Sequence, residues 1–305
     1  NHAFIFADFL AQERDISLEL RFSRTKAMEI YKNGVRQKRQ SDAQGLLKTV
    51  LFCPEDLMLV RAGAAARRRF LDTALCQMRP NYARYLEEYN RLHEHKTRIL
   101  RDSEEKPSLL SMWEDFSLRM AHIGAQIIRY RAYYCRKLLK AAAAVYADIA
   151  PHEVLSGVYK TVSSVTDPFA DARTIEKQLI DHVFSHKTAE IAAKSCLSGP
   201  HKDDLELLLD GRSAASFGSQ GQVRTCTLSL KLAERELFFD EDGEYPVLLL
   251  DDVLSELDRR RQDFVLNRIS AGQVMITCCE DGISEKLRAG AVFHIQNGEK
   301  SAETH

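Results

Sequence analysis

The 305-residue sequence contains no Gly-x-x-x-x-Gly-Lys-Ser/Thr segment, the loop whose backbone cradles the phosphates of a bound nucleotide. No apolar run approaches the ~18 to 20 residues that span a bilayer, so we do not expect a membrane protein. Neither sign of charge is in excess, because 43 Lys and Arg against 44 Asp and Glu leave a formal net charge of −1. Binding of nucleic acid through overall charge is therefore excluded, and any such contact must come from local patches.

Cysteines are few and show no ligand or disulfide pattern. The seven cysteines form an odd, scattered set without a Cys-x-x-Cys pair. The adjacent Cys278 and Cys279 would point to opposite faces of a strand, which suits neither a zinc site nor a disulfide. We therefore expect reduced thiols in a cytoplasmic protein. The opening residues carry no basic stretch of a secretory signal, and because residue 1 is Asn, we expect the chain to begin inside a longer protein.

In the first half of the chain, the spacing of apolar residues changes from the alternation typical of strands to the three-to-four-residue spacing typical of helices. Residues 3–60 are β-rich, and Asn33-Gly34 is typical of a two-residue hairpin turn. Two long apolar patterns with helical spacing then cover residues 82–99 and 113–145, separated by a short polar break. Two helices joined in this way should pair antiparallel. They form either a helical bundle domain or, as we favour, a protruding coiled-coil-like arm of modest length.

The last third alternates between helix and strand, with short apolar strands predicted at residues 247–250, 274–277 and 292–295. A β-rich first part and an α/β last part thus flank a helical middle. The sequence predicts one α/β head domain that is interrupted by a mostly helical lobe. The predicted parts are an N-terminal head portion at 1–76, a helical lobe at 77–192 and a C-terminal head portion at 193–305.

The most informative stretch is an apolar run that ends in two adjacent carboxylates. Asp251 and Asp252 directly follow Val-Leu-Leu-Leu, and Ser-Glu-Leu-Asp occupies residues 255–258. In open α/β sheets, phosphates and Mg²⁺ bind at the carboxyl edge of the strands, where one carboxylate can hold the magnesium or its water shell. Asp252 is then free to orient and polarise an attacking water. The alternative interpretation is an ordinary core strand that runs into an acidic loop.

A small polar turn lies some thirty residues upstream, at the predicted start of a helix over residues 223–239. Gly221 lets a backbone approach a phosphate closely, Ser219 can donate its hydroxyl, and the helix N-terminus offers free N–H groups to an anion. Taken alone, a Ser-x-Gly turn is usually only a helix cap. Its order and distance relative to Asp251 favour a phosphate-binding turn. The candidate residues are Ser219, Gln220, Gly221 and Gln222.

Basic residues gather in two places in the N-terminal part: a run of arginines, and a group near the predicted hairpin. Charge runs are usually solvated surface, but two clusters in one β-rich part favour contacts to DNA phosphates, which position a protein without reading sequence. The candidate residues are Arg67, Arg68, Arg69, Lys38 and Arg39. A further polar cluster at residues 199–204 fits either phosphate contacts or a tight surface turn.

Five blocks, in order along the chain, resemble the RecF family of bacterial recombination mediators, which are relatives of the SMC-type ABC ATPases. The blocks are CPEDL at 53–57, RRFLD at 68–72, GPHKDDL at 199–205, GSQGQ at 218–222 and LDDVLSELD at 250–258. The resemblance implies an ABC-type ATPase head with a short helical second lobe, ATP and Mg²⁺ as ligands, and a dimer that closes on ATP. It also implies binding to double-stranded DNA beside single-stranded gaps, and partnership with RecR and RecO in placing RecA during recombinational repair and the SOS response.

The resemblance also assigns roles by position. Asp251 would serve the magnesium and Asp252 the hydrolytic water. The turn at 219–222 would contact the γ-phosphate that is bound by the opposite subunit. Ser255 and Asp258 would lie in the loop that couples the two sites across the dimer.

The sequence departs from the family pattern in two respects. Many ABC ATPases have a switch His at this position, whereas this sequence has Thr-Cys-Cys-Glu at residues 277–280. The sequence therefore does not support a direct contact from this loop to the γ-phosphate. The family's phosphate loop lies in an N-terminal segment that these 305 residues do not contain, so this stretch could only lend its turn to a complete partner. We expect an ATPase in the full-length form. The alternative is a catalytically incomplete head-fold module for DNA or protein interaction.

Overall fold

The computed structural model describes residues 2–11, 13–162, 164–279, 290–296 and 299–300. The predicted β-rich start forms an antiparallel sheet of four strands in sequential order: β1 (His2–Ala11), β2 (Arg14–Ser23), β3 (Glu29–Lys32) and β4 (Val35–Arg36). Asn33 and Gly34 join β3 to β4 with φ angles of 49° and 75°. These positive values are what a tight hairpin turn requires, so the predicted hairpin is confirmed.

A second sheet is parallel and carries the predicted acidic strand in its middle. Its order is β10-β9-β5, with β5 (Thr49–Phe52), β9 (Val247–Asp251) and β10 (Val274–Thr277). Leu248 and Leu250 of β9 are buried, as expected for a central strand of an α/β sheet. The prediction of a strand at 292–295 is wrong in position: within the described residues only Ile295–Gln296 (β11) pairs, with Glu299–Lys300 (β12), and residues 292–294 have no ladder partner.

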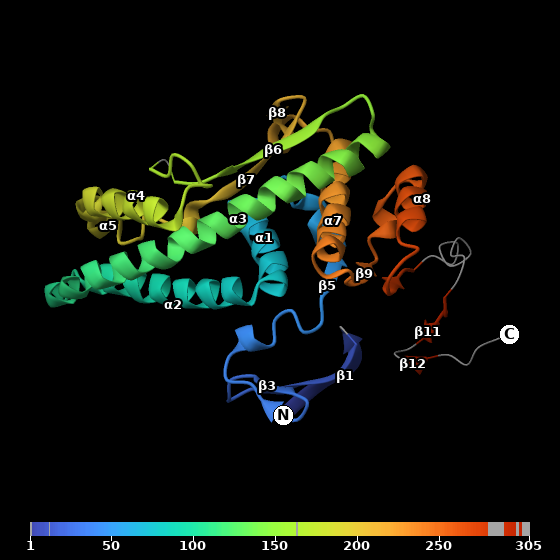
Figure 1. Cartoon of the computed structure of the whole chain (residues 1–305), viewed down its shortest axis with the longest axis horizontal. Coiled ribbons are helices and arrows are strands. Elements are labelled where there is room, and N and C mark those ends of the chain that lie inside the picture. Colours follow the sequence, from blue (N-terminus) through green and yellow to red (C-terminus); the bar gives the residue numbers. More distant parts are fainter. Residues whose placement is uncertain (1, 12, 163, 280–289, 297–298, 301–305) are drawn as a thin grey trace.

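Long helices form the arm that extends from the head in Figure 1. They are α2 (Pro80–Asp102), α3 (Trp113–Ile149) and α4 (Ala172–Ser185), with the short α5 (Lys187–Ala193) after them, while α1 (Ala64–Met78) lies beside the head and precedes the arm. Pro80 begins α2, because a proline is tolerated in the first turn of a helix but not inside one. The predicted antiparallel pair is α2 with α3, and α4 packs on α3 as well. With 37 residues, α3 is about 55 Å long.

A third sheet lies along α3 in the order β6-β7-β8, formed by β6 (Leu155–Lys160), β7 (Asp204–Leu209) and β8 (Arg212–Ser213). Gly157 lets this sheet approach the helix, because a Cβ there would lie 2.6 Å from the Glu206 carbonyl oxygen and 2.8 Å from the Leu139 side chain. β6 belongs by sequence to the predicted lobe at 77–192, and β7 to the predicted head portion at 193–305. These domain boundaries stay a prediction.

The head is completed by helices around the parallel sheet. The longest is α7 (Gln220–Asp242), which packs on α3 and on β5. The shorter helices outside the arm are η1 (Gln40–Asp42), η2 (Pro54–Met58), η4 (Pro200–Lys202), α6 (Ala214–Phe217), η5 (Leu254–Glu256) and α8 (Arg259–Arg268). In the arm, η3 (Pro107–Met112) joins α2 to α3. Across the described ranges, no helix combines the length and apolarity needed to cross a membrane.

A buried ionic junction joins the arm to the head. Arg131 of α3 donates to both carboxylate oxygens of Asp72 on α1, at 2.9 and 3.0 Å, and to Asp203 at 3.2 Å. It also donates to the Pro200 carbonyl oxygen at 2.7 Å. Burial raises the pKa of Asp203 to about 7 and lowers the pKa of His201 to about 3. The polar cluster at 199–204 is therefore largely part of the interior, which neither sequence alternative anticipated.

Candidate functional site

Two adjacent carboxylates lie at the carboxyl edge of the parallel sheet. Asp251 ends β9 and is exposed, and its Oδ1 accepts a hydrogen bond from the Thr277 hydroxyl at 2.6 Å. The backbone N–H of Asp252 donates to the same hydroxyl oxygen at 3.0 Å and to the Thr277 carbonyl oxygen at 3.1 Å. One threonine at the end of β10 therefore fixes both residues. The sequence motif did not single out Thr277.

The backbone of Asp252 is held in an unusual conformation. Its φ angle of 49° is in the left-handed region, which costs a non-glycine residue about 1–3 kcal/mol and is found most often at functional sites. The Ser255 hydroxyl lies 2.7 Å from the Asp252 carbonyl oxygen and 3.1 Å from its Oδ1. Contacts from both sides thus maintain the turn that presents the Asp252 carboxylate.

A third carboxylate, Glu55, comes from η2, directly after the neighbouring strand β5. Its pKa is lowered because its own backbone N–H and the Cys53 thiol donate to it, while the charge of Asp251 opposes this shift. Carboxylates gathered at one edge repel one another unless a cation is present. The described residues contain no group of three or more metal-ligand side chains. Mg²⁺ fits this site nonetheless, because it usually takes one or two carboxylates and completes its shell with waters and phosphate oxygens.

The signature turn (residues 218–222) begins α7. Ser219 is the N-cap, and its Oγ accepts the N–H of Gln222 at 3.2 Å. The Gln222 side chain accepts the N–H of Ser219 in return, at 2.7 Å, which completes a capping box. Because Ser219 Oγ acts as the acceptor here, its own hydrogen stays available to a phosphate. The turn is thus a helix cap, and a helix N-terminus is a backbone arrangement with which proteins bind anions.

Arg261 ties the signature turn to the coupling loop (residues 255–258). Its guanidinium donates to the Gly221 carbonyl oxygen at 3.1 Å and to the Thr225 hydroxyl at 2.9 Å. It also pairs with Asp258, which caps α8 by accepting the Arg261 N–H at 3.0 Å. Sequence reasoning missed Arg261. Its three-residue spacing from Asp258 could suggest the ion pair, but not the contact with Gly221.

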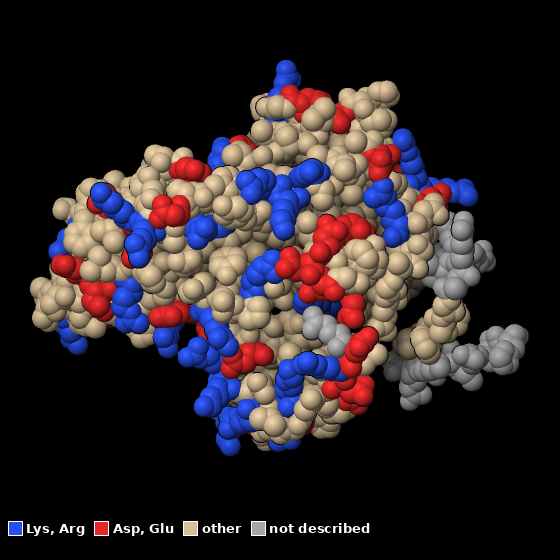
Figure 2. Space-filling model, in the orientation of Figure 1, with Lys and Arg blue, Asp and Glu red and all other residues tan. Residues whose placement is uncertain are grey.

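The candidate DNA-binding residues differ in their surroundings. Arg67 pairs with Asp204 at 2.7 Å, and Arg68 donates to the Asp203 carbonyl oxygen at 2.6 Å, so both are engaged within the protein. The other three candidates are exposed: Arg69, Lys38 and Arg39. On the face of the molecule drawn in Figure 2, lysines and arginines are interleaved with acidic side chains, without one continuous basic area. DNA binding by any of these residues stays a prediction.

The loop after β10 is described only as far as residue 279. Cys278 and Cys279 follow β10 at the carboxylate edge and are both exposed, and neither is part of a disulfide within the described residues. Glu280, which completes the segment that replaces the switch His, lies outside the described residues. Contact of this loop with a γ-phosphate therefore stays an open expectation.

We predict that Thr277→Val slows ATP hydrolysis by about tenfold to 100-fold, because the variant keeps the β-branched shape but loses the hydroxyl that positions Asp251 and Asp252. Thr277→Ser restores the hydroxyl and should recover most of the rate. The check is steady-state phosphate release by full-length protein. Equal rates for the Val and Ser variants would contradict a positioning role for this hydroxyl.

A parallel sheet whose middle strand ends in paired carboxylates, next to a capped signature helix and an inserted helical arm, defines an ABC-type ATPase head. The comparisons identify the particular family. The chain is 32% identical to the DNA replication and repair protein RecF of Acetivibrio thermocellus over 292 residues, which are 96% of this chain and 79% of that protein. It is 37% identical to RecF of Bacillus cereus (strain B4264) over 297 residues, 94% of this chain and 78% of that protein.

Solved structures agree with this result. Two structures of the recombination mediator protein RecF in the RecFOR pathway, RecF-ATPrS and RecF-ATP, have TM-scores of 0.89 and 0.88 at 29% and 28% identity. Each covers 99% of this chain, and the chain covers 81% and 80% of them. None of the known protein-family profiles matches. The chain belongs to the RecF family of DNA replication and repair proteins, which confirms the predicted fold class and resemblance.

Proposed function

We propose that the full-length protein is a cytoplasmic DNA-repair ATPase that dimerises on ATP and binds double-stranded DNA beside single-stranded gaps. We further propose that it acts with RecR and RecO to place RecA. The observation that supports this most strongly is the carboxylate pair Asp251 and Asp252, fixed by Thr277 at the sheet edge. Relatives named for DNA replication and repair, and RecF structures solved with ATP, support it as well.

Each residue of the site has a chemical role in this proposal. Asp251 would hold Mg²⁺ directly or through water, and the bound ion would supply positive charge against the phosphates. Asp252 would orient and polarise the attacking water. Ser219 and the free N–H groups at the start of α7 would bind the γ-phosphate held by the opposite subunit. Arg261 would transmit the position of that turn to the coupling loop through Asp258.

The assignment of residues to domains is also part of the proposal. Residues 1–76 and 193–305 would form the ATPase head, and residues 77–192 the helical lobe. A head-fold module without hydrolysis is the second candidate. A change at Asp252 separates the two candidates, as argued in the Discussion.

Duplex DNA binding should tighten when ATP is present, because dimer closure would bring two sets of phosphate contacts onto one duplex. In the ATP-bound dimer both subunits carry the change, so Arg69→Glu and Lys38→Glu should each reduce the magnitude of the slope of log K against log salt concentration by about 2. The measurement is fluorescence anisotropy of a labelled duplex over a salt series. Arg98→Glu, which removes an exposed arginine of α2, is the control and should leave the slope unchanged. Equal binding with and without ATP would exclude the proposed closure on DNA.

A further inference from the structure

The last turn of α3 is linked to the signature turn through Glu153. Tyr146 of that last turn is fully buried, and its hydroxyl donates a hydrogen bond to Glu153 Oε2 at 2.5 Å. The other carboxylate oxygen, Oε1, accepts a hydrogen bond from Gln222 Nε2 at 2.9 Å. One half-buried carboxylate therefore joins the end of α3 to the first turn of α7.

The side chain of Gln222 can take only one orientation between its two partners. Its Oε1 accepts the Ser219 N–H at 2.7 Å, and its Nε2 faces the carboxylate of Glu153. A flipped amide would set a donor against a donor and an oxygen against a carboxylate. Burial and the hydrogen bond to Glu153 raise the pKa of Tyr146, so its hydroxyl stays protonated and donates. Every link from Tyr146 to Ser219 thus has a defined donor and acceptor.

The same end of α3 is also contacted by α8. Arg260 donates to the Ile149 carbonyl oxygen at 2.9 Å, which satisfies one of the carbonyl groups that a helix leaves without an internal partner at its C-terminus. Arg261, the next residue, reaches the signature turn. The turn is therefore held from two sides, by α8 through Arg261 and by α3 through Glu153 and Gln222.

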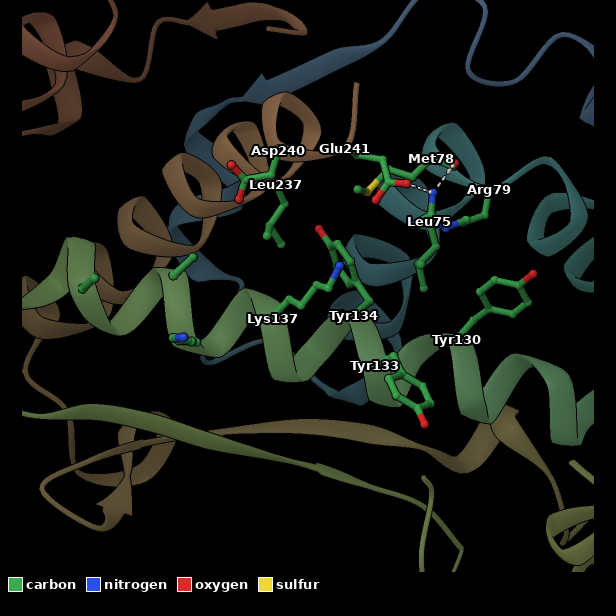
Figure 3. Close-up of a pocket in the computed structure, with 13 residues that line it drawn as sticks. Leu75, Met78, Arg79, Tyr130, Tyr133, Tyr134, Lys137, Leu237, Asp240 and Glu241 are labelled. Carbon is green, nitrogen blue, oxygen red and sulfur yellow. Dashed lines mark hydrogen bonds and ion pairs between the residues drawn. The ribbon is translucent and has the colours of Figure 1, made fainter. Parts of the chain in front are cut away.

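The other end of α7 meets α3 in a different way. Figure 3 shows Leu237 of α7 and Lys137 of α3 on the two sides of a cleft of about 500 Å³. The carboxylate of Glu241 in this lining pairs with Arg79, between α1 and α2, at 2.5 Å. Close packing of the two helices is interrupted at the cleft, whereas the polar contacts of Glu153 lie directly beside the signature turn. These contacts are therefore the more direct connection from α3 to the turn.

We propose that Glu153 is a positioning residue of the ATPase site: through Gln222, it fixes the signature turn relative to α3, so that Ser219 meets the nucleotide of the opposite subunit in one orientation. Glu153 itself touches no reacting atom in this arrangement and acts only through its neighbour. The contact with the opposite subunit rests on the proposed function, whereas the fixing of the turn does not.

The variants remove the link and then rebuild it with the partners exchanged. Glu153→Ala removes both hydrogen bonds. Gln222→Glu sets two carboxylates against each other, which is unfavourable without a cation. Adding Glu153→Gln to Gln222→Glu restores the link, because the introduced amide can donate to the new carboxylate while its oxygen still accepts the Tyr146 hydroxyl. The matched control is Glu94→Gln, which neutralises an exposed carboxylate on α2.

The first measurement is amide hydrogen exchange of the full-length protein without ATP, which needs no dimer. Glu153→Ala should speed exchange at the Ser219 N–H by about threefold to tenfold, because the side chain that accepts this N–H is no longer held. Glu94→Gln should exchange there within about twofold of the parent. Parental exchange at the turn in Glu153→Ala would overturn the proposal.

The second measurement separates ATP binding by one subunit from closure of the dimer. In sedimentation with ATP, Glu153→Ala and Gln222→Glu should each weaken self-association by about threefold to tenfold, and the double variant should return to within about twofold of the parent. Binding of the fluorescent analogue mant-ATP to dilute, monomeric protein should stay within about twofold in all variants, because the turn acts on the nucleotide of the opposite subunit. A purely structural role of Glu153 would not produce this split.

Three results of the second measurement would also count against a positioning role. Parental self-association of Glu153→Ala would show that the orientation of the turn does not matter to the opposite subunit. Equal self-association of Gln222→Glu with and without Glu153→Gln would show that the link itself does not matter. Parallel loss of mant-ATP binding and self-association, with a lower melting temperature, would assign Glu153 to general stability. A parent protein that does not associate with ATP would refute the proposed function, and exchange at Ser219 would then decide alone whether Glu153 fixes the turn.

Discussion

Asp252→Asn should reduce ATP hydrolysis by at least about 100-fold in the full-length protein, while ATP-bound dimers persist. The amide is nearly the same size as the carboxylate and can keep the contact with the Ser255 hydroxyl, 3.1 Å from Oδ1. It cannot polarise a water as an acceptor with full negative charge does. Phosphate release measures the first effect, and light scattering of the ATP-bound protein measures the second.

The matched control is Asp181→Asn, which neutralises an exposed carboxylate on α4 and should leave the rate within about twofold. Hydrolysis at the parental rate by the Asp252 variant would remove Asp252 from the chemistry and favour the module without hydrolysis. Loss of the dimer together with the rate would show that Asp252 maintains the structure of the edge instead of acting on water.

Arg131→Met should lower the free energy of unfolding by about 3–5 kcal/mol, because it leaves the carboxylates of Asp72 and Asp203 without their cation in a buried site. Urea denaturation followed by circular dichroism is the measurement. Arg119→Met removes an exposed arginine from the same helix and should cost less than about 1 kcal/mol.

A second comparison isolates the ionic contribution. Combining Arg131→Met with Asp72→Asn and Asp203→Asn also removes the two carboxylate charges that have lost their cation. The triple variant should therefore be more stable than Arg131→Met alone. An Arg131→Met protein as stable as the Arg119→Met control would contradict the view that this junction holds the arm to the head.

The sequence was sufficient for elements whose signal is local. The period of apolar residues predicted the helix pair α2 and α3, and the run that ends in Asp251 predicted the middle strand of the parallel sheet. The Asn33-Gly34 turn needs only its own two residues to specify positive φ angles. Such features do not depend on which distant segment lies next to them.

The sequence was insufficient where a contact joins distant segments. Thr277 is 26 residues from Asp251, and Arg261 is 40 residues from Gly221, so neither contact leaves a spacing that can be read along the chain. The cluster at 199–204 is strongly polar in sequence, yet Asp203 is buried because Arg131 supplies a cation from α3. Pairing of this kind is decided by the tertiary fold, which overrides the usual exposure of charged residues.

The continuity of α3 has a mechanical consequence. The same uninterrupted 37-residue helix packs against α7 at the head and against α2 and α4 in the arm. A helix of this kind behaves as a lever, since it bends little compared with the loops around it. Because Arg131 is paired in the junction with the head, a tilt of about 5° about this residue would displace the end of α3 at Trp113, roughly 27 Å away, by about 2 Å. A small tilt of α3 where it packs on α7 is thereby converted into a larger movement at the tip of the arm.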